Sequence, residues 1–327
     1  MMGLAGRRMR DVLRLGLVIL PVLMLVSGGL GQTTGDDEVI KVETSLVSLP
    51  ITVFDRNGRY ISDLKRENFK VIEDGAEQEV EYFAPVDTPV TVLLLLDCSG
   101  SMGENLSSMV QAAGSFMSRL KAEDTVGILT FARDTEEALP LTKLKNFPKN
   151  IQIHQRSRVK TRVYNAVDIA LRKLENVKGR KAIILFSDGV SEEPETLGKK
   201  NMADAEEQEA LIYTVRFSES AASSQKSGPM RSFFSSEKPT DDKERKVAAY
   251  MTGLAYKTGG RSFRIEAITD LQKTFGDIAS ELRRQYTIGY YSNKPGPGGQ
   301  HRDIKVQVNI PGAAVRTRNA VALHRKN

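Results

Sequence analysis

Three oxygen-bearing side chains follow one apolar run of the sequence at intervals of two residues. Asp97, Ser99 and Ser101 stand in the stretch Asp-Cys-Ser-Gly-Ser-Met-Gly, directly after the apolar segment 91–96. A carboxylate and two hydroxyls are hard oxygen ligands, which Mg²⁺, Mn²⁺ and Ca²⁺ prefer, whereas zinc is bound mostly by nitrogen and sulfur. The pattern therefore indicates a site for a hard divalent cation.

The segments around this stretch predict where such a site would lie. The run 91–96 has the continuous apolar character of a strand that is buried on both faces of a parallel sheet. A helix-like segment, about 104–121, follows it. In doubly wound sheets, ligands bind just beyond the carboxyl ends of the strands, so we expect the three side chains at that edge.

Strand-like and helix-like patterns alternate through the rest of the central part of the chain. This alternation predicts an α/β fold with a doubly wound, mostly parallel sheet. The expected strands are 126–131, 135–141, 181–186, 211–215 and 261–265, and the expected helices are 163–174, 202–209, 246–257 and 269–284. Residues 142–158 are ambiguous and partly helical in pattern, and the polar segment 218–245 is expected to form a surface loop.

Both ends of the chain carry strand patterns separated by turn residues. The strand-like segments are 39–54, 78–83, 286–291 and 303–310. Turns are expected at 55–58, which contains Asn-Gly, and at 73–75, which contains Asp-Gly, because these residues tolerate the positive φ of tight hairpins. We expect the two ends to pair with each other in a small β module that flanks the α/β domain.

The first 31 residues have the composition of a targeting segment. Arg7, Arg8 and Arg10 precede an apolar segment, 15–26, and small residues follow it. A basic region, an apolar region and a small-residue zone in this order predict a signal peptide, and hence an exported protein of the periplasm, the cell envelope or the medium. An uncleaved membrane anchor is the alternative, and it would be the only membrane contact that we expect.

Net charge and cysteine content exclude some classes of partner and chemistry. The formal charge of +6 falls to +3 without the four arginines and one aspartate of the first 31 residues, which is too balanced to favour nucleic-acid binding. Cys98 is the only cysteine, so no internal disulfide is expected. Because no histidine lies near it in the sequence, we interpret Cys98 as a small buried residue rather than a nucleophile.

The stretch from Asp97 to Ser101 resembles the first motif of the von Willebrand factor type A (VWA) domain, Asp-x-Ser-x-Ser. Two later segments resemble further motifs of this family in the same order: Thr-Arg-Val-Tyr-Asn-Ala at 161–166 and Ile-Ile-Leu-Phe-Ser-Asp-Gly at 183–189. Segment 69–78 has the pattern Phe-x-Val-x-Glu-Asp-Gly-x-x-Gln, and it is similar to the region before the A domain in bacterial proteins described as VWFA-related. The resemblance covers about residues 89–285 and implies a Rossmann-like fold.

The resemblance also implies a metal-ion-dependent adhesion site, or MIDAS. Its ligands would be Asp97, Ser99, Ser101, Thr161 and Asp188. The cofactor would be Mg²⁺, or else Mn²⁺ or Ca²⁺, and one open coordination position would accept the carboxylate of an Asp or Glu from a protein partner. The chain departs from the family pattern at Lys160, where glycine is common, and at Asn165, where aspartate is common. Neither residue is a ligand, but Lys160 would bring a cation near the ion.

The function that follows is an exported binding or adhesion module without enzymatic activity. A metal-dependent hydrolase or phosphatase is one alternative. Haloacid dehalogenase-type phosphatases also place an Asp at the end of the first strand, but they require a second acid two residues later, where this chain has Ser99. A metal-free structural assembly protein is the other alternative, in which Asp97 caps a loop and Asp188 caps a helix. No phosphate-binding loop of the Gly-x-x-x-x-Gly-Lys-Ser/Thr kind is present, which disfavours nucleotide chemistry.

These observations together predict the domain organisation. A signal peptide would occupy 1–31, an N-terminal β module 38–86, the VWA domain 89–285, and a C-terminal β hairpin and tail 286–327. The Pro-containing segment 84–89 would connect the β module to the first strand of the sheet.

Overall fold

A computed structural model of the chain describes most of the residues that follow the expected leader. The described residues are 46–85, 88–148, 153–154, 161–189, 191, 193–218, 241–294 and 300–322. The chain divides into two units, 1–41 and 42–327, and every described residue belongs to the second. The expected signal peptide, the residue Lys160 and most of the expected loop 218–245 therefore lie outside the described residues.

A six-stranded sheet forms the centre of the unit. Its strands stand in the order β10-β9-β8-β5-β6-β7, and all are parallel except the edge strand β7. Their bounds are β5 Val90–Asp97, β6 Thr125–Phe131, β7 Thr135–Lys143, β8 Arg180–Ser187, β9 Leu211–Phe217 and β10 Ser262–Ile265. The parallel strands all end at one edge of the sheet, so the mostly parallel doubly wound fold expected from the sequence is confirmed.

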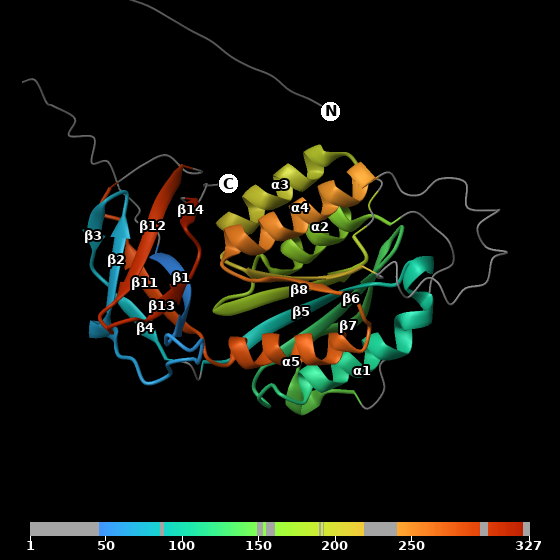
Figure 1. Ribbon diagram of the computed structural model, residues 1–327, viewed down its shortest axis with the longest axis horizontal. Helices are drawn as coiled ribbons and strands as arrows, with labels where there is room; N and C mark the ends of the chain where they lie inside the picture. The colour runs from blue at the N-terminus through green and yellow to red at the C-terminus, as the bar shows by residue number, and fades with distance from the viewer. Residues whose placement is uncertain are drawn as a thin grey trace, which may run out of the picture. The chain divides into compact units, whose positions relative to one another are not determined.

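Helices cover both faces of this sheet (Figure 1). Helices α1 (Leu106–Met117) and α5 (Asp270–Leu282) lie on one face. Helices α2 (Val163–Leu174), α3 (Glu195–Glu207) and α4 (Asp241–Thr258) lie on the other. Each layer of helices closes its own apolar core against the sheet, which is why the central strands read as continuous apolar runs.

Strand β5 lies between β6 and β8, and it contributes to both cores. Leu94 and Leu96 pack in the core on the side of α1 and α5, whereas Leu93 and Leu95 pack in the core on the other side. Burial of both faces fixes the register of the strand, because a shift by one residue would exchange the two sets. Asp97, the last residue of β5, is therefore held at the carboxyl edge of the sheet.

The two ends of the described chain interleave in a β module of two antiparallel sheets. One sheet has the order β13-β1-β11-β4 and the other β14-β12-β2-β3. The bounds are β1 Leu46–Phe54, β2 Phe69–Glu73, β3 Ala76–Gln78, β4 Tyr82–Ala84, β11 Tyr286–Tyr291, β12 His301–Val308, β13 Ala314–Arg316 and β14 Ala320–Ala322. Because β1 pairs with β11 and β2 pairs with β12, the expected pairing of the two ends is confirmed.

Several expected elements differ from the structure. Residues 78–83 do not form one strand, because the chain leaves β3 at Gln78 and enters the other sheet at β4, where Tyr82 pairs with Gly289. Helix α3 begins at Glu195 rather than 202, and α4 begins at Asp241 rather than 246, so 241–245 are helical and not loop. Both helices start in polar segments, where the apolar periodicity that marks a helix is weak.

The ambiguous segment 142–158 is only partly described. Its helical part is the short 3-10 helix η3 (Leu144–Asn146), and its first two residues belong to the end of β7. Strand β7 confirms the strand expected at 135–141; it lies antiparallel at the edge of the sheet and continues to Lys143.

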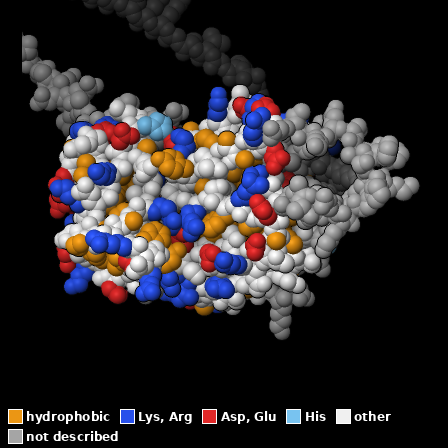
Figure 2. Space-filling model, viewed as in Figure 1, with side chains coloured by type: hydrophobic (Ala, Val, Ile, Leu, Met, Phe, Trp, Pro, Cys, Tyr) orange, Lys and Arg blue, Asp and Glu red, His pale blue; other side chains and the backbone are white. Residues whose placement is uncertain are grey.

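The exposed surface shows no single dominant charge on the face drawn in Figure 2, where basic, acidic and apolar side chains are interspersed. This mixture fits the modest net charge of the sequence. Within the described part of the chain, no helix has both the length and the apolar character needed to cross a membrane.

Candidate metal centre

Asp97 is fully buried at the end of β5, and both of its carboxylate oxygens accept hydrogen bonds. The backbone N–H of Ser99 donates to Oδ1 at 3.0 Å, which is the loop-capping contact that an Asp at a strand end often makes. The hydroxyl of Ser187, the last residue of β8, donates to Oδ2 at 2.7 Å. Asp97 is thus held between the loop after its own strand and the end of the neighbouring strand.

A chain of hydroxyls links this loop to the loop after β8. The Oγ atoms of Ser99 and Ser101 are 3.1 Å apart, and the Ser101 hydroxyl donates to Oδ2 of Asp188. Ser99 is buried, whereas Asp188 is half-buried, so the group opens toward the surface at the carboxyl edge. Four of the five expected ligands, Asp97, Ser99, Ser101 and Asp188, are therefore brought together by the structure.

Thr161 lies at the same edge of the sheet. The next residue, Arg162, donates its N–H to the carbonyl of Ala132 at 2.9 Å, just beyond β6. The N–H of Cys98 donates to the carbonyl of Phe131 at 2.8 Å, at the end of the same strand. Two backbone bonds thus attach the Thr161 segment and the Asp97 loop to one point of the sheet, and Thr161 is buried there.

The two carboxylates influence each other electrostatically. Burial, and after it the negative charge of Asp188, together raise the pKa of Asp97 to about 7, although the hydrogen bonds from Ser187 and Ser99 oppose the rise. A cation between the two acids would remove their repulsion. Carboxylates and hydroxyls at one edge are a hard oxygen donor set, so the residues present fit Mg²⁺, Mn²⁺ or Ca²⁺.

The donor set has few acids for a metal site. Among the described residues, no group of three or more His, Cys, Asp or Glu side chains is placed to hold a metal ion. The candidate centre instead combines two carboxylates with hydroxyls, as the sequence motif implies. Such a set would leave a bound ion with little charge compensation from the protein.

Two residues of the centre were not expected from the sequence. Ser187 bonds Asp97 directly, and its only sequence signal is its place at the end of an apolar strand beside Asp188. Glu193 lies in the loop after Asp188 and bonds the start of α2. Asp188 itself is not a helix cap, because α3 begins only at Glu195, with Pro194 in the capping position.

Cys98 is buried, as expected for a small core residue beside the centre. Lys160, the expected departure from the family pattern, lies outside the described residues. Asn165, the other departure, lies in the first turn of α2, and its N–H donates to Glu193.

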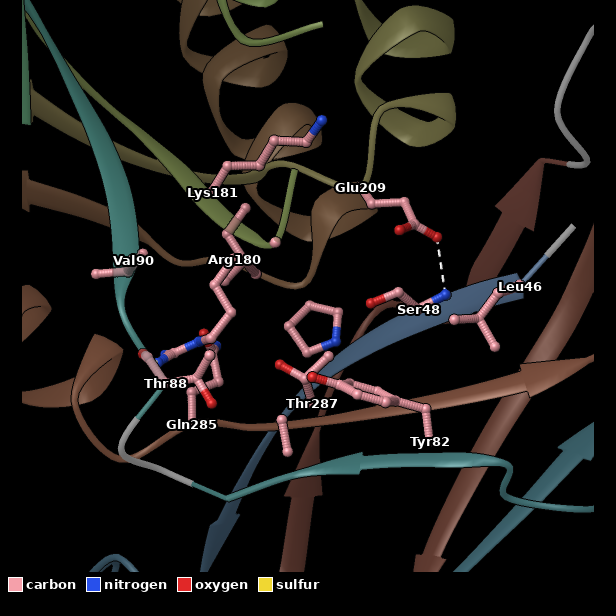
Figure 3. Close-up of a pocket in the computed structure, with 14 residues that line it drawn as sticks. Leu46, Ser48, Tyr82, Thr88, Val90, Arg180, Lys181, Glu209, Gln285 and Thr287 are labelled. Carbon is pink, nitrogen blue, oxygen red and sulfur yellow. Dashed lines mark hydrogen bonds between the residues drawn. The ribbon is translucent and has the colours of Figure 1, made fainter. Parts of the chain in front are cut away.

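A cavity of about 290 Å³ lies at the opposite edge of the central sheet (Figure 3). Val90 and Arg180, which begin β5 and β8, line one side, and Ser48 and Tyr82 of the β module line another. Its charged groups are already engaged: Glu209 Oε1 accepts from the N–H of Ser48 at 2.8 Å, and Arg180 donates to the carbonyl of Thr88 at 2.7 Å. This arrangement joins the β module to the α/β domain.

Residues 92–190 match the family model of the von Willebrand factor type A domain. This segment extends from β5 to just beyond β8, and it contains all five of the expected ligands. The chain therefore carries a von Willebrand factor type A domain, as its motifs had indicated.

The chain also matches solved structures from several organisms at low sequence identity. A von Willebrand factor type A protein from Catenulispora acidiphila is 11% identical, with 87% of this chain and 75% of that chain covered and a TM-score of 0.43. The ArnB paralog VWA2 from Sulfolobus acidocaldarius is 13% identical, with 86% and 76% covered and a TM-score of 0.43. The hypothetical protein BatB from Bacteroides thetaiotaomicron is 17% identical, with 59% and 98% covered and a TM-score of 0.38. No curated protein matches the chain.

Proposed function

We propose that this protein is an exported binding module that holds a divalent cation at a MIDAS-type centre and grips an acidic residue of a protein partner. The observation that carries the proposal is the hydrogen-bonded group of Asp97, Ser99, Ser101 and Asp188 at the carboxyl edge of the sheet. The match to a domain family of protein-interaction modules supports the same reading.

The roles of the side chains follow from their charge. Asp97 and Asp188 would supply the negative charge, and Ser99, Ser101 and Thr161 would supply neutral oxygens. When bound, the cation would act as a Lewis acid, with one coordination position open to a carboxylate of the partner. Most of the ligands are neutral, so the ion would keep most of its positive charge. It would therefore attract a partner's carboxylate more strongly than an ion whose charge the protein fully compensates.

The cellular place and the class of activity are part of the proposal. The basic and apolar leader supports export, and the carboxylate-accepting centre supports a protein partner at the cell envelope or outside it. A phosphatase is less well supported, because Ser99 stands where a second catalytic acid would be needed. The side chain of Ser99 is also buried and in contact with Ser101.

The variant Asp97→Asn tests the proposal, because it keeps the shape of the side chain and removes its charge. Titration calorimetry with Mn²⁺ on the purified chain should give one site per wild-type molecule and at least about tenfold weaker binding for the variant. Capture of partner proteins from the native envelope should be lost both in the variant and in the wild type with excess chelator. Circular dichroism should show the same fold for both proteins.

Two outcomes would contradict the proposal. Partner capture that persists in excess chelator would mean that binding does not use the cation, which favours the metal-free structural alternative. Turnover of an aryl phosphate by the wild type, lost in Asp97→Asn, would favour the hydrolase.

A further inference from the structure

Helix α2 begins without a cap of its own. Its first residue is Val163, and Arg162 in the capping position makes no side-chain hydrogen bond to the helix. The first intrahelical bond runs from the N–H of Ala166 to the carbonyl of Arg162 at 3.1 Å. The N–H groups of the preceding residues therefore need partners from elsewhere, because a helix leaves its first donors unsatisfied.

Glu193 supplies these partners from a different loop. Its Oε2 accepts from the N–H of Tyr164 at 2.7 Å, and the N–H of Asn165 lies 3.1 and 3.2 Å from its two oxygens. These are the donors that a local capping side chain ordinarily satisfies. A carboxylate at this place also interacts favourably with the positive end of the helix dipole.

Other contacts hold the carboxylate in this position. The Glu193 side chain is only 4% exposed, and Nε of Arg162 lies 3.4 Å from Oε1. The hydroxyl of Ser191 donates to Oε2 at 3.3 Å. Both oxygens of Glu193 therefore interact with protein donors, which hold the carboxylate against the start of α2.

Each of the two segments that Glu193 joins carries one of the expected ligands. Asp188 stands at the start of the loop that contains Glu193, and Thr161 stands two residues before the first turn of α2. We infer that Glu193 is a positioning residue that caps α2 from the Asp188 loop and so fixes the Thr161 segment relative to Asp188. The inference rests on the proposed function, since fixing these segments matters for a metal only if they hold one.

The test compares Mn²⁺ affinity in Glu193→Ala, Glu193→Gln and the wild type, with the full chain and titration calorimetry. Glu193→Ala should bind Mn²⁺ about tenfold more weakly or worse, as is usual when a residue that orients a ligand is removed. Glu193→Gln should fall between the two, because its amide oxygen still accepts from Tyr164 or Asn165. Hydrogen exchange of these two amides should be faster in Glu193→Ala than in Glu193→Gln.

A matched control separates positioning from loss of stability. Glu206 is also a buried acid with an ion-pair partner, Lys257, but it lies near the end of α3 that faces away from the centre. Glu206→Gln should lower the melting temperature and leave the Mn²⁺ affinity within about twofold of the wild type.

These measurements distinguish a failure of the positioning role of Glu193 from a failure of the proposed metal centre. If the wild type binds Mn²⁺ and Glu193→Ala binds it equally well, the positioning role is wrong while the metal centre stands. If Glu206→Gln weakens Mn²⁺ binding as much as Glu193→Ala, the effect is general destabilisation, and the inference is likewise overturned. If the wild type binds no Mn²⁺, the proposed metal centre itself fails and the inference fails with it.

Discussion

Asp97 occupies a place that is unfavourable for a carboxylate without a cation. It is fully buried, and both burial and the neighbouring charge of Asp188 raise its pKa to about 7. The hydrogen bonds from Ser99 and Ser187 recover only part of the lost hydration. Asp97 therefore lowers the stability of the metal-free fold. Residues of functional sites often have such a destabilising effect.

The first prediction concerns the stability of Asp97→Asn. In chelator at neutral pH, this variant should melt no lower than the wild type, because a neutral amide of the same shape avoids the repulsion from Asp188. Adding Mg²⁺ should raise the melting temperature of the wild type and leave that of the variant unchanged, since ligands stabilise only the state that binds them. A melting temperature of the variant several degrees below the wild type in chelator would show that Asp97 is a stabilising structural acid.

Two glycines, Gly260 and Gly114, differ in how closely neighbouring atoms approach them. A Cβ on Gly260, just before β10, would lie 2.1 Å from the carbonyl oxygen of Ile212 in β9. A Cβ on Gly114, in the exposed part of α1, would meet nothing within 4 Å. Gly260 is therefore required, because its backbone lies too close to that of Ile212 for a side chain to fit. Gly114 has no such neighbour and only lowers the stability of helix α1.

The second prediction follows from this contrast. Gly260→Ala should lower the free energy of unfolding by about 1–3 kcal/mol or prevent folding, because backbone atoms must move apart. Gly114→Ala should raise it by about 0.5–1 kcal/mol, since alanine is the better helix former. Urea denaturation of the two variants measures both effects, and a similar change of the same sign in both would contradict the packing described here.

Elements were predicted well where their pattern is local. The bounds of α2 match the apolar period from Val163 to Leu174, and β5 follows from its apolar run. The start of α3 was missed because Leu197 is the only large apolar residue of its first two turns. The contacts of Ser187 and Glu193 join segments that lie far apart in the sequence, so the periodicity within one segment could not predict them. Asp97, Ser99 and Ser101 belong to one short motif and Asp188 to a second, and each motif can be recognised from neighbouring residues of the sequence.

The β module and the α/β domain are joined through a buried acid on α5. Glu281 is completely buried, and its Oε1 accepts from the hydroxyl of Tyr213 at 2.8 Å. Arg261 lies 3.4 Å from Oε2, and Arg316 of β13 in the β module forms an ion pair with Oε1. At the scale of the described unit, the two parts share a charge network, and we expect them to unfold together.

The third prediction tests this coupling with Arg316→Ala. Removing one partner of the buried Glu281 should lower the free energy of unfolding by about 3 kcal/mol. The loss will be smaller to the extent that Tyr213 and Arg261 still stabilise the carboxylate. The control is Arg264→Ala, which breaks an exposed pair with Glu266 at 3.7 Å and should cost about 0.5 kcal/mol or less. Unfolding in two separate steps, or equal effects of the two variants, would contradict a shared network.

The most direct measurement is anomalous diffraction from crystals of the chain grown with Mn²⁺. The account predicts one strong peak among the oxygens of Asp97, Ser99, Ser101, Thr161 and Asp188, at the carboxyl edge of the central sheet. The same crystals of Asp97→Asn should show no peak at that place. A well-ordered edge without a peak in the wild type, or an ion that contacts neither Asp97 nor Asp188, would contradict the account.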